Sequence, residues 1–127
     1  MPINHDLASL AARLLIAPLF IVFGFEKITG YASSAGYMEA YGLPGMLLPL
    51  AILVELGGGL AVLFGVFSRW AALVLAGFCI VTALVFHTAW SGDGGQGQFI
   101  NFMKNFALAG GLVLLAANGP GKYAVRD

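Results

Sequence analysis

The sequence predicts an all-α integral membrane protein, a bundle of four transmembrane helices, and three observations lead to this fold class. First, 60% of the 127 residues are apolar and only 9% are charged, against roughly 45–50% and 25% in soluble domains. Second, the mean hydropathy is +0.91, which leaves too few polar side chains to form a hydrated surface. Third, four segments are long enough to cross a hydrocarbon core about 30 Å thick, which requires about 20 helical residues. We therefore expect one membrane domain covering residues 1–127.

The four predicted spans are bounded by polar, glycine or tryptophan residues, and they cover Leu7–Phe25, Met46–Val66, Trp70–Trp90 and Phe99–Asn118. In the third span, the distance between Trp70 and Trp90 on a continuous helix is about 30 Å at 1.5 Å per residue. Such a helix places one indole in each interfacial region of the bilayer. The sequence Gly119-Pro120-Gly121 ends the fourth span, because proline cannot continue a helix.

The segment Ser33–Tyr41, between the first and second spans, is too short and too polar to cross a bilayer. A serine at its start and Gly42 at its end are typical helix boundaries. Tyr37, Met38 and Tyr41 fall on one side at helical spacing. We expect a short amphipathic helix lying at the membrane interface, and the alternative is an irregular loop.

The composition excludes several classes of function. Six basic and six acidic residues give zero formal net charge, and no basic patch suited to nucleic acid is visible. The single cysteine, Cys79, rules out an internal disulfide and a CxxC redox pair. No His, Cys and carboxylate cluster has the spacing of metal ligands, so we expect no metal site and no covalently attached cofactor.

Basic residues near the span ends predict the orientation. With four spans, both termini and the loop between the second and third spans share one side. That side carries Arg69, Lys122 and Arg126, whereas the opposite side has mainly acidic residues and Lys27, which follows Glu26. We expect a multi-pass protein of the bacterial inner membrane with both termini in the cytoplasm.

Charged residues inside the spans are the most informative feature, because a charge in a membrane helix is costly and usually has a partner. Counted from the predicted cytoplasmic ends, Glu55 and Lys104 lie at similar depth, about 18 and 21 Å, and Arg13 lies at about 9 Å. We expect Arg13, Glu55 and Lys104 to form an intramembrane polar network. Its role is either an ion pair that fixes helix order or a functional site opening to the outer face.

A second group of polar residues falls near the predicted outer ends of the spans. It consists of Glu26, Lys27, Tyr31, His87 and Asn105. A histidine there suits a quinone carbonyl or a proton relay, so these residues form a candidate outer-face site for a quinone. The alternative is that each residue only marks the hydrated interface.

Small residues recur every four positions in the second span, at Gly57, Ala61 and Gly65. Such a stripe lets another helix approach closely. It is either a homodimer interface or a packing surface within the bundle.

Taken together, several short segments resemble the DoxX family of small bacterial inner-membrane proteins, over about residues 7–123. The matching segments are Arg13 in the first span, GFEKITGY at 24–31, YGLPG at 41–45, ELGGGLAVLFG at 55–65, His87, FMKNFALAGG at 102–111 and GPGKY at 119–123. The resemblance implies a four-helix membrane bundle. Some members resemble subunits of quinone-linked sulfur oxidation, and others resemble partners in thiol and oxidative-stress responses.

Three functions are compatible with these features. The first is a redox-associated subunit that binds a quinone and works with a redox enzyme partner, since the chain carries no redox group of its own. The second is a non-catalytic membrane scaffold or partner protein. The third, weakened by the lack of an inverted repeat, is a transporter of small solutes or protons.

Overall fold

A computed structural model describes residues 3–126, and every regular element in them is helical. The long helices are α1 (His5–Thr29), α5 (Ser68–Phe86) and α6 (Gly95–Asn118), and α2 (Tyr31–Ala40) is a shorter helix after α1. Between α2 and α5 the chain forms the 3₁₀ turn η1 (Gly45–Leu47), α3 (Leu48–Ile52), the π-helical η2 (Leu53–Gly57) and α4 (Gly58–Phe64). Within the described residues, four helical segments are long and apolar enough to span a membrane, which agrees with the predicted fold class.

The span boundaries differ from the predicted ones by up to four residues. The first span runs over His5–Thr29 and the second over Gly45–Phe64. The third ends at Phe86, so the prediction that Trp90 ends this helix is wrong. Trp90 lies in the following loop, where its ring contacts Phe99 and Phe102 of α6. The fourth span was predicted to begin at Phe99, but α6 begins at Gly95, so the glycines at positions 95 and 97 belong to its first turn.

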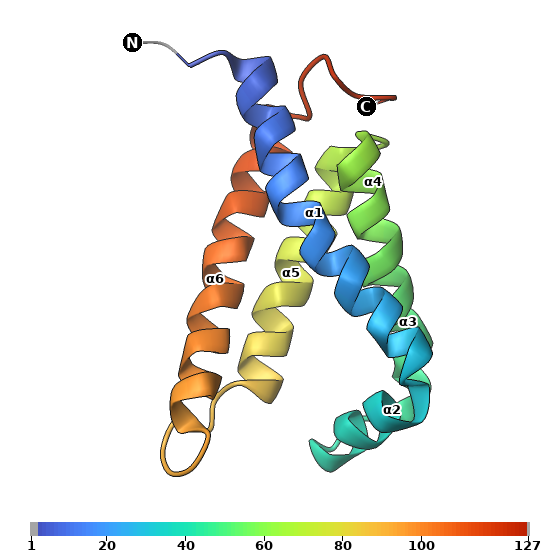
Figure 1. Cartoon of the computed structure of the whole chain (residues 1–127), viewed down its shortest axis with the longest axis vertical. Helices are drawn as coiled ribbons and strands as arrows, with labels where there is room; N and C mark the ends of the chain where they lie inside the picture. Colours follow the sequence, from blue (N-terminus) through green and yellow to red (C-terminus); the bar gives the residue numbers. More distant parts are fainter. Residues whose placement is uncertain (1–2, 127) are drawn as a thin grey trace.

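The four spans meet at one end and separate at the other (Figure 1). The end where they meet carries the described ends of the chain, and we call it the closed end. Towards the opposite end α5 and α6 stay paired, while the lower part of α1 and α3 lie apart from them (Figure 1). We call this the open end, and α2 lies across it.

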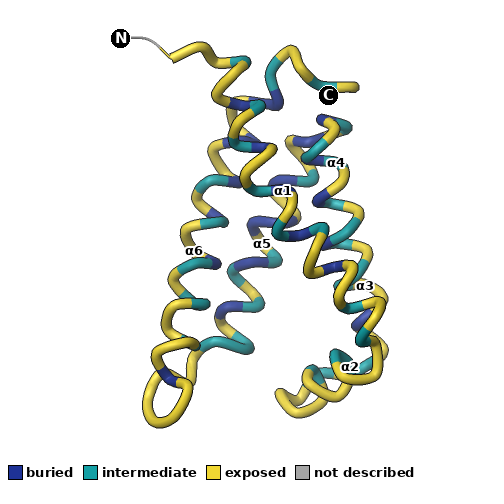
Figure 2. The backbone as a smooth tube through the Cα atoms, viewed as in Figure 1, coloured by how far each residue is buried: buried dark blue, intermediate teal, exposed yellow. Residues whose placement is uncertain are grey.

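Buried residues form narrow stripes along the helices, and exposed residues occupy much of the rest of each helix (Figure 2). Phe20, Val62, Leu75 and Leu112 are at most 2% exposed and belong to one core cluster. By contrast, Leu15 is 80% exposed. Apolar side chains exposed in this way are suited to contact lipid.

α1 crosses the second span at two glycines. A Cβ atom on Gly24 would lie 2.9 Å from the backbone nitrogen of Leu56, and one on Gly59 would lie 3.0 Å from the side chain of Ile21. These contacts define how α1 is aligned with η2 and α4. Close backbone packing of this kind is typical of small residues in membrane helices.

The predicted small-residue stripe is only partly available for contact with a second copy. Gly57 and Ala61 line a shallow outward groove between α4 and α5. Gly65 instead adopts a left-handed conformation, with φ of 72°, and is covered by Ala124 of the same chain. A homodimer through Gly57 and Ala61 stays a prediction, and Gly65 is a packing residue.

Candidate functional site

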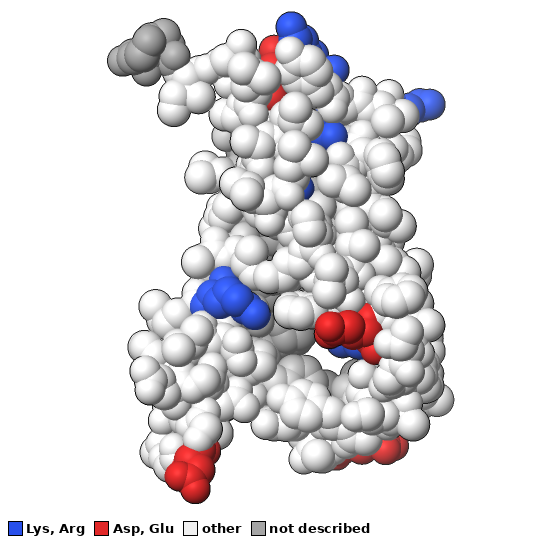
Figure 3. Space-filling view, viewed as in Figure 1, with Lys and Arg blue, Asp and Glu red and all other residues white. Residues whose placement is uncertain are grey.

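A cavity of about 850 Å³ lies between the separated helices at the open end. Its volume falls within the range of small-molecule sites, about 300–1,000 Å³. Side chains from α1, α2, α3, η2, α5 and α6 line it, and most of them are apolar. Figure 3 shows the hollow with basic atoms beside it and acidic atoms across from them. Its charged or amphoteric lining residues are Glu26, Lys27, Glu55, His87 and Lys104.

Glu55 is the buried charge of the cavity. Glu55 is 3% exposed, and its Oε1 lies 2.6 Å from Nζ of Lys27 on α1. The approach is off the axis of a hydrogen bond, so Oε1 has a charged partner but no well-aligned donor. The Lys27 side chain is 30% exposed and also lines the cavity, so the pair joins a buried carboxylate to a partly exposed ammonium.

The backbone at Glu55 is π-helical from Leu53 to Gly57. A π segment widens the helix by one residue per turn, changes the direction of the side chains that it carries, and is frequent at functional sites. Pro49, at the start of α3, already interrupts the regular pattern one turn earlier. The second span is therefore irregular in the half that borders the cavity.

Lys104 lies on α6, on the cavity wall. Its Nζ is 5.5 Å from the centre of the Phe23 ring on α1. This is a cation–π distance. Lys104 and Glu55 thus line the same cavity, but Glu55 forms its ion pair with Lys27.

His87 and Asn105 occupy the rim and the inner wall of the cavity. Nδ1 of His87 is 2.7 Å from Oε1 of Gln98, and the carbonyl of His87 accepts a hydrogen bond from the Trp90 indole. Nδ2 of Asn105 donates to the hydroxyl of Thr82 at 3.1 Å. A primary amide has two N–H groups, so Asn105 retains one donor for a ligand.

The structure thus brings four of the five predicted outer-face residues onto one cavity: Glu26, Lys27, His87 and Asn105. Tyr31 does not line it and is exposed at the start of α2. The sequence did not assign Phe23, Tyr37 or Thr82 to a site, although all three line the cavity. Phe23 and Thr82 are residue types common on any membrane helix, and Tyr37 was predicted only as part of an interfacial helix.

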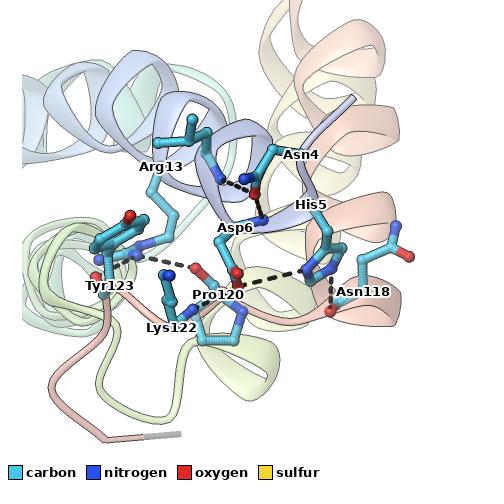
Figure 4. Close-up of polar contacts among 9 residues, drawn as sticks. Asn4, His5, Asp6, Arg13, Asn118, Pro120, Lys122 and Tyr123 are labelled. Carbon is cyan, nitrogen blue, oxygen red and sulfur yellow. Dashed lines mark hydrogen bonds and ion pairs between the residues drawn. The ribbon is translucent and has the colours of Figure 1, made fainter. Parts of the chain in front are cut away.

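Arg13 does not join the cavity, and its predicted network with Glu55 and Lys104 is wrong. Its guanidinium is buried at the closed end and donates to four backbone carbonyls. Two belong to Val62 and Leu63 at the end of α4, at 2.9 and 2.7 Å. The others belong to Pro120 and Tyr123, at 3.0 and 2.8 Å (Figure 4).

The error has a geometric cause. The predicted depths aligned the cytoplasmic ends of the first two spans, at Leu7 and Phe67. The contact between Gly24 and Leu56 moves Glu55 about six residues further along α1, or about 9 Å. This shift takes Glu55 away from Arg13 and brings it to Lys27.

The closed end is held by further polar contacts of the C-terminal segment. Oδ1 of Asp6 accepts from the backbone N–H of Lys122 at 2.8 Å, and His5 Nε2 is 3.0 Å from the carbonyl of Asn118 (Figure 4). Backbone bonds also join Phe67 to Arg126 and Val125 to Phe64. The segment after α6 therefore covers the ends of α1 and α4.

The short helix α2 contacts α5 at the open end through aromatic rings. The Tyr37 and Tyr41 rings lie 5.3 and 5.0 Å from the Phe86 ring and 5.0 Å from each other. Partial burial, with the neighbouring Tyr41, raises the pKa of Tyr37, and Gln98 opposes this shift. We call Tyr37, Tyr41 and Phe86 the aromatic contact.

Comparison with known proteins identifies the family. The sequence profile of the DoxX family matches residues 8–88, more than half of the chain. The chain belongs to the DoxX family. It is 50% identical over 122 residues to inner membrane protein YqjF of Escherichia coli (strain K12), covering 95% of this chain and 91% of that protein. It is 34% identical over 120 residues to inner membrane protein YphA of the same strain, covering 91% and 86%. No solved structure matches it.

The DoxX assignment and the four spans make this chain an integral, multi-pass inner-membrane protein. Among residues 3–126, no three His, Cys, Asp or Glu side chains gather as metal ligands. The candidate site of this DoxX chain is the amphipathic cavity with the Lys27–Glu55 pair.

Proposed function

We propose that this DoxX protein is a redox-associated membrane subunit that binds a quinone in its cavity and presents it to a redox enzyme partner. The observation that carries the proposal is a single cavity that joins apolar walls to polar groups at its open end. A quinone has the same division, with two carbonyl acceptors on its ring and an apolar tail.

The lining residues have suitable roles in this proposal. Lys104 and the second N–H of Asn105 supply donors for carbonyl oxygens. The Lys27 ammonium carries an exchangeable proton, and the Glu55 carboxylate is its ion-pair partner. Reduction of a quinone to a quinol needs two electrons and two protons, so the partner enzyme would supply the electrons and this pair would relay the protons from water at the open end.

The orientation belongs to the same proposal. Arg69, Lys122 and Arg126 come after the second span or after α6, on the side of the closed end. By the positive-inside rule, this distribution supports a closed end and both termini in the cytoplasm. The cavity would open towards the outer half of the inner membrane.

The test is titration of the purified chain with a short-tailed ubiquinone and a short-tailed menaquinone. A Trp70→Phe background leaves Trp90, which binds the His87 carbonyl at the cavity rim, as the fluorescent reporter. We expect saturable quenching by at least one quinone. Asn105→Leu should weaken quinone binding about tenfold, because losing one hydrogen bond costs about 1.4 kcal/mol of binding free energy.

The matched control is Asn101→Leu, one turn earlier on α6 and outside the cavity lining. It should leave quinone affinity within about twofold of the unchanged chain. If neither quinone quenches Trp90 saturably, the quinone proposal fails and a membrane scaffold is the better interpretation. Equal losses in both asparagine variants would also contradict a site at Asn105.

A further inference from the structure

One charged side chain that lines the cavity, Lys104, has no ion-pair partner among the described residues. Glu55 and Lys27 form an ion pair, and Glu26 is exposed at the rim. Within residues 3–126, no carboxylate lies within ion-pair distance of Lys104. The Lys104 ammonium instead makes a cation–π contact with the face of the Phe23 ring.

An ammonium group without a carboxylate is unusual inside a membrane span. A lysine near the centre of a membrane helix is costly to insert, and such residues normally have a partner or line a polar path. Lys104 is the tenth residue of the 24-residue α6 and is only partly exposed. The cation–π contact with Phe23 offsets only part of this cost.

Lys104 lies where two of the helices that border the cavity approach each other. It is a half-buried residue of α6 that lines the cavity, and its ammonium contacts the Phe23 ring of α1. Apolar lining residues such as Leu19 and Phe20 continue inward from there.

We propose that Lys104 is the counter-ion for an anionic amphiphile, a lipid-soluble molecule whose headgroup is a carboxylate or a phosphate. The headgroup pairs with the Lys104 ammonium, and the apolar chain lies along the apolar wall. A charge-assisted hydrogen bond to an anionic oxygen is stronger than the cation–π contact that it replaces. The two natural sources of this chemistry are free fatty acids and phospholipids. The inference rests on the same cavity as the proposed function but does not require a quinone.

The experiment uses three ligands with the same acyl chain and different headgroups: oleate, oleoyl lysophosphatidate and oleyl alcohol. Each is titrated onto the detergent-solubilised full chain, and native mass spectrometry counts the bound molecules. We expect at least one anionic ligand to bind about ten times more tightly than the alcohol. Preference for oleate identifies a fatty acid site, and preference for lysophosphatidate identifies a phospholipid site.

Two substitutions at position 104 and one control test the role of the charge. Lys104→Met should abolish the preference over the alcohol, and Lys104→Arg should retain it. Because Lys104 has no carboxylate partner among the described residues, neither change leaves a buried acid unpaired. The matched control is Lys122→Met, since Lys122 makes a similar contact with the Tyr123 ring at 5.3 Å at the closed end. That variant should keep the preference.

The inference is overturned if the unchanged chain binds all three ligands equally, or if Lys122→Met loses the preference as fully as Lys104→Met. Quinone titrations of the same preparations separate this result from the proposed function. Anion preference without quinone binding removes only the quinone proposal. Quinone binding without anion preference removes only the counter-ion role of Lys104.

Discussion

At the scale of single residues, the Arg13 side chain joins three separate parts of the chain. It lies on α1 and donates to carbonyls at the end of α4 and in the segment after α6. A guanidinium has five N–H donors in a fixed plane, and its four contacts with these carbonyls are shorter than or equal to 3.0 Å. Lysine, with one ammonium, cannot satisfy carbonyls in this arrangement.

We expect Arg13→Met to lower the free energy of unfolding by at least about 3 kcal/mol, because it leaves buried carbonyls without their donor. Thermal unfolding in detergent measures the change. Arg126→Met is the control, since that side chain is exposed and lies over the Phe67 ring, and it should cost less than about 1 kcal/mol. An Arg13→Met protein as stable as this control would contradict a structural role for Arg13.

The sequence marks Arg13 as a residue that needs partners, but it does not identify them. Its partners are backbone carbonyls, which every residue has, so no side chain of complementary charge marks them. Glu55 illustrates the same limit in another way. Its partner Lys27 is charged and was recognised as a polar site residue, but the choice among Lys27, Lys104 and Arg13 depends on helix alignment.

At the scale of elements, the four spans follow from length and hydropathy, because a helix satisfies its own backbone groups in lipid. The interruption of the second span does not follow. The π segment Leu53–Gly57 contains no proline, and its apolar residues suit a regular helix equally well. The boundary of α5 was also misplaced, because Trp90 packs on the rings of α6 instead of extending α5 to the interface.

The helix α2 was predicted from Ser33–Tyr41 and forms over Tyr31–Ala40. None of its residues is buried, so its attachment depends on few contacts. The aromatic contact of Tyr37 and Tyr41 with Phe86 supplies the rings that join it to α5. An element held in this way opens with a low free energy.

We therefore expect Phe86→Ala to release α2 from α5. Each aromatic pair contributes about 0.5–1.5 kcal/mol, and the substitution removes the two pairs that Phe86 makes with Tyr37 and Tyr41. Local opening of α2 then costs less free energy, so amide hydrogen exchange across residues 31–40 should become about tenfold faster. Exchange measured by mass spectrometry tests this. Phe64→Ala, an exposed phenylalanine at the closed end, should leave exchange in α2 unchanged. Equal exchange in the two variants would show that the aromatic contact does not hold α2.

At the scale of the whole molecule, the two ends of the bundle differ in charge and in packing. Basic atoms gather at the closed end, while the acidic atoms in Figure 3 lie mainly towards the open end. The closed end is filled by the C-terminal segment. The cavity thus lies among the separated helices of the open end, while the C-terminal segment covers the closed end.

The orientation can be measured with fusions. A green fluorescent protein fused after residue 126 should fluoresce, and an alkaline phosphatase fused there should be inactive, because both report a cytoplasmic terminus. Phosphatase inserted in the loop before Gly95 should be active, which supplies the matched control at the other end. The reverse pattern would place the cavity mouth towards the cytoplasm.

The contacts of Arg13 also constrain the order in which the molecule can be assembled. The carbonyl of Pro120 follows Arg13 by 107 positions. At a translation rate of about 5–20 residues per second, the first helix waits roughly 5–20 s for that carbonyl to be made. During this interval the guanidinium must stay hydrated or be shielded by the insertion machinery. The nascent bundle therefore closes in a late step, when the segment after α6 folds back over α1.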